Sequence, residues 1–323
     1  MKIVHRISKP SLLLMGVITL FSSCSSDNST VPPPSEPSFI FSDIDLFWEV
    51  YDTQNFSSSN FQNEYVSKGT IGLKDYATQK NLAPALNSTL SSQHYIDYYD
   101  AIRSSTLDLS DAITKSEVAF DQLKEIHDDV LILNTYFIMG AATAGGRISQ
   151  NGLLIAVEMF SRDETIDISN LSEWHQSVIR NKQYLPSIVV HEFIHIQQFN
   201  LRHDGTVLEA SLAEGMADFL SHYLLKGEPF MNEHLHTYGD PKEEELWMEF
   251  ENEMDLSTSQ TEWLYTAKTT ANGHPADMGY YMGYKIYESF SANYQTQEEA
   301  IQAMLTTSYR EVFEASGYSD KFN

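Results

Sequence analysis

The sequence predicts an α+β fold that is predominantly helical, with a small sheet and a pair of helices around a candidate metal site. Apolar residues recur at helical spacing before residue 127 and after residue 205. Two apolar, β-branched runs, 130–139 and 152–160, flank a glycine-rich stretch in the middle of the chain. Residues 191–195 then read His-Glu-Phe-Ile-His, which places two imidazoles on one face of a helix.

Residues 1–23 have the pattern of an export signal, so we expect them to be absent from the fold. A positively charged start precedes the apolar run 12–21, which is too short for a comfortable membrane span. Small residues lead to Cys24, and the arrangement resembles a bacterial lipoprotein signal with Cys24 as the lipidated first residue. The alternative is an ordinary secretory signal with an incidental cysteine. Because Cys24 is the only cysteine, the mature chain cannot form an intramolecular disulfide.

The segment 24–38 is rich in serine and proline, which predicts a flexible, lipid-anchored tether without a core of its own. Residues 39–323 are predicted to form one folded domain. Its N-terminal lobe is expected to cover about 39–200 and its C-terminal helical lobe about 201–323. The sequence holds no second run of eighteen apolar residues, so only the anchor is expected to contact a membrane.

The chain is strongly acidic, with 20 Lys and Arg residues against 45 Asp and Glu residues and a formal charge of -25. Loss of Lys2, Arg6 and Lys9 with the export signal removes three positive charges and takes the charge to -28. A charge of this sign argues against nucleic acid as a partner. Acidic clusters at 243–245 and 249–253 are typical of a solvated surface, and a preference for basic peptides is the alternative.

The first and central helices follow from the apolar pattern. The segment 43–68 predicts one or two amphipathic helices, and further helices follow to about residue 127. After the two predicted strands, Pro186 suits the first turn of a helix that runs to about Phe199. Apolar residues surround 191–195 on this helix, as expected where a metal is held inside a protein.

On that helix, His191 and His195 can reach one metal ion while Glu192 projects beside them. A catalytic zinc ion takes three protein ligands and leaves one position for water, so a third ligand is expected downstream. The candidate is Glu214, within a helix predicted from Thr206 to about residue 226.

Two other residues of this second helix have predicted roles. Thr206 and Glu209 form a Thr-x-x-Glu capping box, which gives Glu209 a structural role. Asp218 follows Glu214 by one turn, where it is placed to accept a hydrogen bond from a ligating imidazole.

The spacing of these residues resembles that of the gluzincins, the zinc metallopeptidases in which a glutamate follows HExxH. The residues that match are His191, Glu192, His195 and Glu214, with Asp218 as the supporting carboxylate. A longer resemblance, over about 130–318, is to a bacterial family of predicted zinc-dependent proteases described as a domain of unknown function and often found on lipoproteins. This second resemblance includes the Gly-Tyr segment 279–284.

The resemblance implies a zincin-like metallopeptidase whose active-site helix pair lies between two lobes. One Zn²⁺ ion would be bound by His191, His195 and Glu214, zinc-bound water would be the nucleophile, and Glu192 would be the general base. The substrate would be a peptide or protein. One predicted strand would lie at a sheet edge beside the metal and pair with the substrate backbone, and core strands without substrate contact are the alternative.

In gluzincins a tyrosine or histidine of the C-terminal lobe also donates a hydrogen bond to the developing oxyanion. The candidates here are His274, Tyr280, Tyr281 and Tyr284, with Arg310 as a further candidate. Tyrosines at helical spacing are more often core or cleft-lining residues, and a single arginine is more often paired at the surface, so these alternatives stay open.

Two other functions are also compatible with the sequence. The first is a non-proteolytic, zinc-binding envelope lipoprotein that acts as a binding or assembly factor, since metal ligands alone do not show an open cleft. The second is hydrolysis of a non-peptide amide such as a cell-wall linkage. We expect a lipid-anchored protein of the bacterial cell envelope, and Ser25 after Cys24 resembles lipoproteins of the outer membrane. The oligomeric state does not follow from the sequence.

Overall fold

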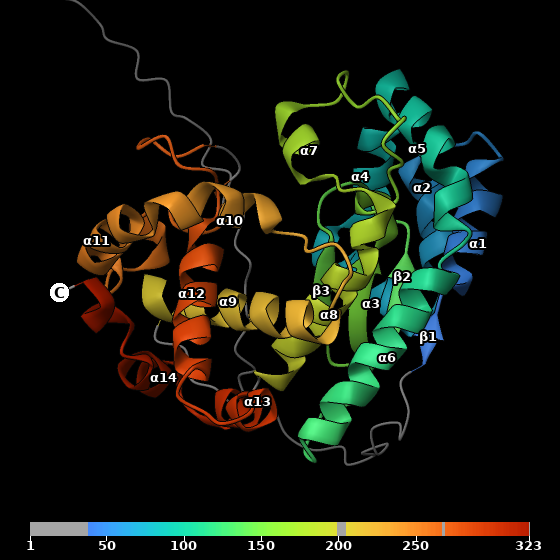
Figure 1. Cartoon of the computed structure of the whole chain (residues 1–323). Coiled ribbons are helices and arrows are strands. Elements are labelled where there is room, and N and C mark those ends of the chain that lie inside the picture. Colours follow the sequence, from blue (N-terminus) through green and yellow to red (C-terminus); the bar gives the residue numbers. More distant parts are fainter. Residues whose placement is uncertain (1–37, 199–204, 267–268, 323) are drawn as a thin grey trace, which may run out of the picture. The chain divides into compact units, whose positions relative to one another are not determined.

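One small sheet with helices packed against it lies next to a group of crossing helices (Figure 1). The computed structural model describes residues 38–198, 205–266 and 269–322, all within the unit Pro32–Asn323. Most of these residues are helical, which confirms the predicted α+β, predominantly helical class. The predicted export signal, Cys24 and the tether up to residue 37 lie outside the described residues, and the division into two lobes stays a prediction.

The strands are β1 (Phe39–Ile40), β2 (Asn134–Ile138), β3 (Gly146–Ser149) and β4 (Gly152–Ala156). The helices before β2 are α1 (Ser42–Tyr51), α2 (Ser58–Asn60), α3 (Ile71–Lys80), α4 (Leu82–Thr89), α5 (Gln93–Thr106) and α6 (Ser110–Ile126). The helices after β4 are α7 (Glu173–Val178), α8 (Leu185–Gln197), α9 (Val207–Leu224), α10 (Glu233–Gly239), α11 (Glu243–Glu253), α12 (Met278–Ser291), α13 (Gln297–Thr306) and α14 (Tyr309–Ser316). Short turns of other helical types are η1 (Phe61–Val66), η2 (Val157–Met159), η3 (Lys182–Tyr184), η4 (Asp240–Lys242), η5 (Thr258–Gln260) and η6 (Tyr318–Phe322).

The sheet has the strand order β1-β2-β4-β3, in which β3 is antiparallel to β4 and the other pairs are parallel. The predicted runs 130–139 and 152–160 contain β2 and β4, but both strands are shorter than predicted. The prediction that the glycine-rich stretch only separates two strands is wrong, because its residues Gly146–Ser149 form the edge strand β3. Four residues with partly exposed side chains are too few to give a strand pattern in the sequence.

The second predicted run ends early because the chain turns at η2, where Glu158 is fully buried. Its carboxylate accepts hydrogen bonds from the backbone amides of Gly140, at 2.8 Å, and Ala142, at 3.0 Å. Ala142 has a φ of 54°, a left-handed conformation that non-glycine residues adopt only when their surroundings hold them there. Glu158 therefore fixes the loop that leads from β2 into β3.

Side chains alternate between the two faces of the sheet. Tyr136 faces α3, where its ring leaves room only for a glycine at position 72. Phe137 faces the other side and stacks on Phe39, whose ring stacks in turn on Phe120 of α6. Phe120 also stacks on Phe193 of α8, with ring centroids 3.7 Å apart. This aromatic column holds α8 against the sheet.

The predicted helices over 43–68 are confirmed as α1, α2 and the π-helical η1. Trp48 and Tyr65 are fully buried, and each of them places its polar atom on a partner. The indole of Trp48 donates to Thr106 at 3.0 Å, and the Tyr65 hydroxyl donates to the carbonyl of Met139 at 2.9 Å. The N-terminal helices therefore pack on the same loop that Glu158 fixes.

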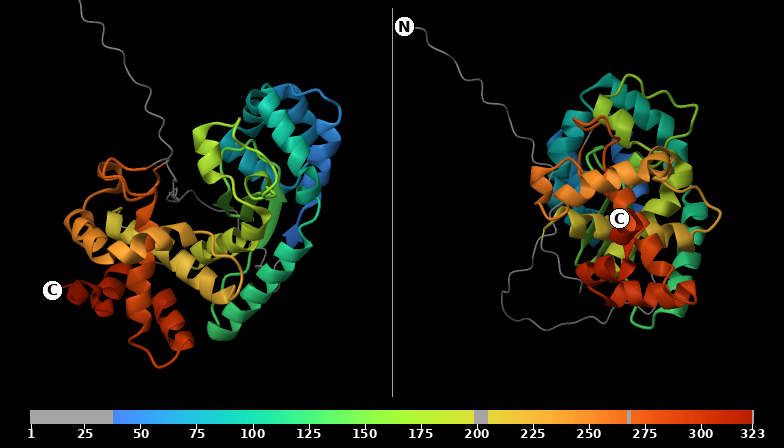
Figure 2. Two further views of the ribbon diagram at one scale, coloured as in Figure 1. Left: turned by 45° about the horizontal axis from the view of Figure 1, so that its top comes forward. Right: turned by 60° about the vertical axis from the view of Figure 1, so that its left-hand side comes forward.

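Helix α12 crosses α9 at very short range (Figures 1 and 2). A Cβ atom on Gly283 of α12 would lie 1.8 Å from the carbonyl oxygen of Ser211, and one on Gly215 of α9 would lie 2.2 Å from the carbonyl carbon of Gly283. Only glycines allow the two backbones to approach this closely. The crossing brings the predicted Gly-Tyr segment onto the helix that carries Glu214.

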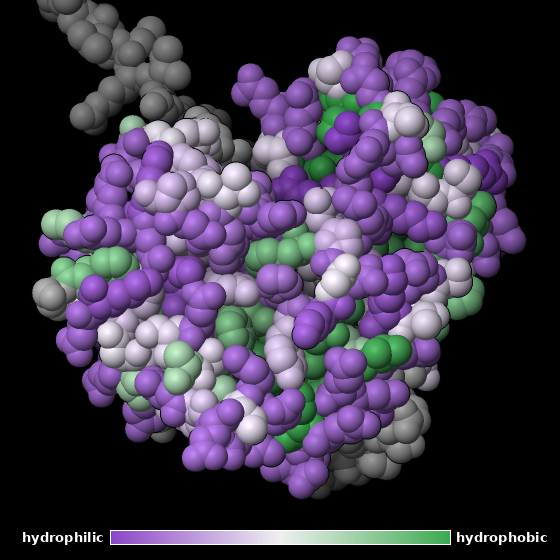
Figure 3. Space-filling view, in the orientation of Figure 1, coloured by the Kyte–Doolittle hydropathy of each residue, from purple (hydrophilic) through white to green (hydrophobic). Residues whose placement is uncertain are grey.

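The helix caps agree with the sequence. Pro186 lies in the first turn of α8, as predicted, and Thr206 caps α9 by accepting a hydrogen bond from the amide of Glu209 at 3.3 Å. The predicted end of α8 near Phe199 lies outside the described residues. In the part of the chain that the structure describes, no helix is both long enough and apolar enough to cross a membrane. The face of the molecule in Figure 3 is mainly hydrophilic, in line with the acidic composition.

Candidate metal centre

Helices α8 and α9 present three candidate metal ligands to one point. Nε2 of His191 lies 3.0 Å from Nε2 of His195, its neighbour one turn along α8. Oε2 of Glu214, on α9, lies 3.3 Å from Nε2 of His191 and 3.2 Å from Nε2 of His195. The structure thus brings together the three residues that the sequence predicts as ligands.

The orientation of His191 is fixed by a carboxylate behind it. Nδ1 of His191 lies 2.9 Å from Oδ1 of Asp218, and the amide of Asn232 donates to Oδ2 of Asp218 at 2.7 Å. Because an ionised carboxylate only accepts hydrogen bonds, Nδ1 of His191 carries the proton. In the neutral imidazole, Nε2 then has a free lone pair that faces His195 and Glu214. The predicted role of Asp218 agrees with this geometry.

His195 is held in the same way by an amide. Nδ1 of His195 lies 2.8 Å from Oε1 of Gln198, whose Nε2 donates to the carbonyl of Ala213 at 2.8 Å. The bond to Ala213 fixes which end of the amide faces His195, so Nδ1 of His195 must donate. Gln198 is buried and links the metal-binding faces of α8 and α9. The lone pair of Nε2 on His195 therefore also points at the centre.

The three donor atoms fit a zinc ion. Two ligands of a tetrahedral zinc ion, each about 2.0 Å from the metal, lie about 3.3 Å apart. The three separations here are 3.0, 3.2 and 3.3 Å. Three atoms with lone pairs repel one another at this range unless a cation or a proton lies between them. Two imidazoles and one carboxylate are also a donor set that zinc uses in catalytic sites.

Carboxylates control the protonation of both imidazoles. Burial lowers the pKa of His191, but hydrogen bonds to Asp218 and Glu214 outweigh it and raise that pKa to about 10. Burial also lowers the pKa of His195, whereas the charge of Glu214 raises it above its ordinary value. Burial alone would raise the pKa of Glu214, but the two histidines hold it well below the usual range. The centre therefore favours positive charge beside an ionised carboxylate.

Glu192 lies between the metal centre and the edge strand of the sheet. A Cβ atom added to Gly146 of β3 would lie 2.3 Å from Oε1 of Glu192, so the carboxylate rests on the backbone of this strand. The charge of Glu192 also contributes to raising the pKa of His195. The strand beside Glu192 is thus the edge strand β3. The prediction that one of the runs 130–139 and 152–160 forms this edge is wrong, because their strands β2 and β4 lie inside the sheet.

Residues 43–320, from α1 to η6, match the family model described as gliding motility protein GldB. The chain belongs to the GldB family. No curated protein and no solved structure matches it. The GldB family is a lipoprotein family, which supports the predicted envelope association, while an outer-membrane location stays a prediction. The similarity to gluzincins and to predicted zinc-dependent proteases also stays a prediction.

Among the predicted oxyanion residues of this GldB-family chain, Tyr280 lies at the centre. Its ring stacks on the imidazole of His191, with centroids 6.1 Å apart and an angle of 15° between the planes. Burial, followed by the charge of Glu214, raises the pKa of Tyr280 well above its usual range. Tyr280 therefore keeps its proton at neutral pH and can donate a hydrogen bond.

The structure does not bring the other candidates to the three ligands. Tyr284, one turn after Tyr280, bonds to Nδ1 of His222 at 2.9 Å. His274 lies between the Tyr238 hydroxyl, at 2.9 Å, and a carboxylate oxygen of Glu249, at 3.0 Å. Both side chains are therefore held by partners of their own, outside the group of three candidate ligands.

Tyr281 and Arg310 are also placed elsewhere. Tyr281 is fully buried and donates a hydrogen bond to Asp240 at 3.3 Å. Arg310 forms a partly exposed ion pair of 2.9 Å with Asp255. Both agree with the ordinary roles that the sequence left open, a core tyrosine and a surface ion pair.

Sequence reasoning missed Tyr265, whose hydroxyl donates to Oε1 of Glu214 at 3.0 Å. The run 263–265 is apolar and aromatic, a pattern that predicts core anchors and gives no sign of a metal site. Gln198 and Asn232 were missed as well, although the position of Gln198 three residues after His195 is a usable signal. A distant hydrogen-bond donor such as Asn232 has no signal in a single sequence.

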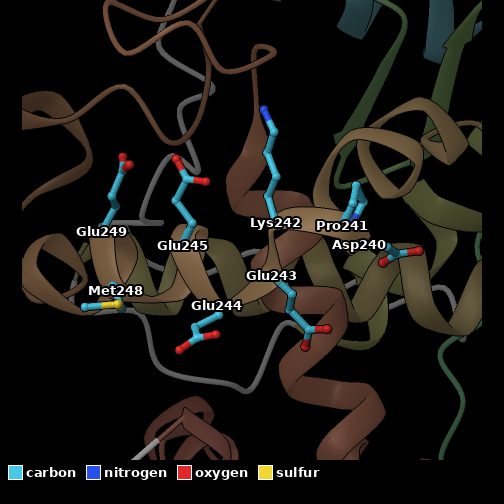
Figure 4. A pocket seen from close by; sticks show the side chains of 8 residues that line it. All are labelled: Asp240, Pro241, Lys242, Glu243, Glu244, Glu245, Met248 and Glu249. Atoms are coloured by element: carbon cyan, nitrogen blue, oxygen red, sulfur yellow. The ribbon is translucent and has the colours of Figure 1, made fainter.

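A hollow of about 620 Å³ lies over η4 and α11. None of the three candidate ligands lines it. Figure 4 shows Glu245 and Glu249 on one side of α11 and Glu244 on the other, so these carboxylates do not converge on one point. The hollow is therefore a solvated acidic surface, as the composition predicts.

Proposed function

We propose that this GldB-family lipoprotein is a zinc-dependent hydrolase of peptide bonds. One observation carries the proposal: three lone-pair atoms of His191, His195 and Glu214 lie 3.0 to 3.3 Å from one another. Their separations suit a tetrahedral zinc ion. The carboxylate of Glu192, which is not one of the three ligands, lies beside them. A purely structural zinc site would have no use for a base in that position.

The arrangement around α8 supports a zincin-like fold. Just before β3, the carbonyl of Gly145 accepts a hydrogen bond from the amide of Ala156, so the backbone groups of Gly146 point away from β4. Gly146 thus presents its backbone N–H and C=O groups at the outer edge of the sheet next to Glu192, where an extended peptide can add as a further strand. The carbonyl of Ile148 accepts a hydrogen bond from Gln79 at 3.2 Å, which limits the open edge to the part nearest Glu192.

A bound zinc ion would polarise the peptide carbonyl and lower the pKa of a water molecule to about 7. Glu192 takes the proton of the attacking water on its carboxylate and returns it to the nitrogen of the leaving amine. Tyr280 donates its phenolic proton as a hydrogen bond toward the carbonyl oxygen as negative charge develops there. Asp218 and Gln198 hold the two imidazoles in the tautomer that leaves each Nε2 free.

The test compares wild type with Glu192→Gln after zinc loading, on a broad peptide library read by mass spectrometry. Both proteins should bind one zinc ion, and the variant should cleave about 100-fold or more slowly, since general acid-base catalysis contributes about 10²- to 10⁴-fold. Glu245→Gln, on the acidic surface of α11, is the matched control and should cleave like wild type. Equal cleavage by wild type and Glu192→Gln would contradict the mechanism.

The family description favours one other function. Because the matching family is a gliding motility family, a zinc-binding envelope factor that assembles with other proteins without cleaving them is the second candidate. Stoichiometric zinc in a wild-type protein that cleaves no peptide of the library would support it. Absence of zinc binding would contradict both candidates.

A further inference from the structure

A second cavity of the described surface has a volume of about 360 Å³. Its lining includes Arg180 and Tyr184 from the segment before α8, and Phe230, Met231, Glu233 and His234 from the segment that leads into α10. Two of these side chains are apolar, and one is a guanidinium. Such a mixture of apolar walls and a few polar groups is typical of a site for a small ligand or for part of a peptide.

Hydrogen bonds connect this cavity to the metal centre. Met231 and Glu233 line the cavity, and Asn232 stands between them in the chain. The side-chain amide of Asn232 donates to Asp218 at 2.7 Å, and Oδ1 of Asp218 lies 2.9 Å from Nδ1 of His191. On the opposite side, Tyr184 stands just before α8 and seven residues before His191, which is about two helical turns or about 10 Å along the axis. Tyr184, in the wall of the cavity, therefore lies about the length of three residues of an extended peptide from His191.

Arg180 has no carboxylate partner within ion-pair distance among the described residues, and its one hydrogen bond from a guanidinium nitrogen goes to the carbonyl of Ser177. Burial lowers the pKa of Arg180, although a guanidinium remains charged at neutral pH. The carboxylate that affects it is Asp277, whose own pKa is raised to about 6 by burial. A partly buried guanidinium without an ion-pair partner among the described residues is placed to bind an anion that enters the cavity.

The surroundings of Arg180 also favour an anion at this position. Tyr184 directly precedes the first residue of α8, where the helix dipole is positive, and Arg180 lies five residues before that helix. The rest of the chain carries a large negative charge, so anions are repelled from most of its surface. Glu233 and His234 also line the cavity and are largely exposed. Burial, followed by the charge of Arg180, lowers the pKa of His234, which keeps this imidazole neutral.

We propose that this cavity binds a carboxylate of the peptide substrate through Arg180, two or three residues from the cleaved bond. Phe230 and Met231 then contact the apolar part of the residue that bears the carboxylate. The proposal rests on the proposed peptide hydrolysis and names its substrate class. The carboxylate comes either from the C-terminus of a short peptide or from an aspartate or glutamate side chain, and both sources offer Arg180 the same planar, two-oxygen partner.

The experiment uses the zinc-loaded full chain and matched peptides taken from a sequence that wild type cleaves. One pair differs in a C-terminal carboxylate against a C-terminal amide, and a second pair in glutamate against glutamine. Wild type should prefer one carboxylate form by about 10- to 100-fold in kcat/KM, the range expected for a charge-assisted hydrogen bond. The pair that shows the preference identifies the source of the carboxylate.

Arg180→Gln should bring kcat/KM for the two forms of the peptide to the same value, and Arg180→Lys should retain part of the preference. Arg103→Gln, which breaks a surface pair with Asp52, is the control and should keep the full preference. Thermal melting of each variant reports loss of folding. An equal kcat/KM for both forms in wild type, or an unchanged preference in Arg180→Gln, would overturn the proposal while peptide hydrolysis stands.

The carboxylate site can also be tested if the protein does not hydrolyse peptides. If wild type cleaves no peptide, fluorescence anisotropy with labelled acid and amide peptides on the zinc-loaded protein still measures binding. Tighter binding of the acid by wild type, lost in Arg180→Gln, would support the carboxylate site without hydrolysis. Equal binding of both peptides would overturn it.

Discussion

The hydroxyl of Tyr265 donates a hydrogen bond of 3.0 Å to Oε1 of Glu214, across 51 residues of sequence. The other carboxylate oxygen, Oε2, is the one that faces the two imidazoles. Tyr265 has a φ of 59°, a left-handed conformation that costs a bulky residue about 1 kcal/mol or more. A strained backbone that places one hydroxyl on a candidate metal ligand indicates that Tyr265 fixes the rotamer of Glu214.

Tyr265→Phe should weaken zinc binding by about 10- to 100-fold, the usual cost of losing a hydrogen-bond partner of a metal ligand. The measurement is a competition titration against a fluorescent chelator of known affinity. Tyr294→Phe changes an exposed tyrosine outside the centre and should leave the affinity unchanged. A zinc affinity of Tyr265→Phe equal to that of wild type would show that Tyr265 is not needed to hold the rotamer of Glu214.

Gln198 should matter for the same reason on the other side of the centre. Gln198→Ala removes the acceptor behind His195, so the imidazole loses its fixed tautomer and zinc affinity should fall by about 10-fold or more. Gln198→Glu restores an acceptor for Nδ1 of His195 but loses the bond to Ala213, and should bind zinc more tightly than the alanine variant. The reverse order of affinities would argue that Gln198 acts only by joining α8 to α9.

The grouping of the three candidate ligands could be predicted because local geometry largely determines it. On one helix, the four-residue spacing of His191 and His195 already places both imidazoles on one face. Glu214 and Asp218 follow on a second helix whose start is marked by the cap at Thr206, and the structure confirms both helices. The fold class could be predicted for the same reason, since helical and strand periodicities are local patterns.

The rest depends on tertiary packing that a single sequence does not encode visibly. Strand β3 is too short for a pattern, and its role follows from contact between Gly146 and Glu192. Tyr280 and Tyr284 are both tyrosines on one helix, and only the crossing of α12 over α9 decides that Tyr280 reaches His191. Tyr265 reads as a core aromatic until the loop that carries it is seen against Glu214.

The glycine crossing of α9 and α12 should be sensitive to one methyl group. Gly283→Ala would place a Cβ atom 1.8 Å from the carbonyl oxygen of Ser211, a backbone atom that cannot move alone. We expect the free energy of unfolding to fall by about 2 to 3 kcal/mol through overpacking, measured by urea denaturation. On an unconstrained helix the same change stabilises by roughly 0.5 to 1 kcal/mol, so a gain in stability would contradict the close crossing.

Gly146→Ala should separate metal binding from catalysis. The new Cβ atom would lie 2.3 Å from Oε1 of Glu192 and would force this side chain into another rotamer, whereas the three ligands are untouched. If the proposed hydrolysis is correct, zinc affinity should match wild type and kcat should fall by about 100-fold, as for a general base displaced by about 1 Å. Loss of zinc together with activity would instead indicate that β3 supports the ligands themselves.

Glu158 should make stability depend on pH. Burial raises its pKa to about 7, although the amides of Gly140 and Ala142 lower it, whereas the unfolded chain has an ordinary value near 4.5. The folded state therefore binds more protons, so the stabilisation is complete below about pH 4.5 and is lost as the pH rises through about 7. The difference of about 2.5 pH units corresponds to about 3 kcal/mol as an order of magnitude.

The measurement is urea denaturation of wild type and Glu158→Gln at intervals between pH 5 and pH 8. Glutamine cannot ionise, and its NH₂ group opposes one of the two backbone amides, so the variant should be less stable at low pH. The difference between the two proteins should shrink as the pH rises from 5 to 8, because only wild type loses the contribution of a protonated Glu158. Other titrating groups, including the histidines of the metal centre, are common to both proteins and cancel in this difference. A difference that stays constant over this range would show that Glu158 does not change its protonation between pH 5 and pH 8.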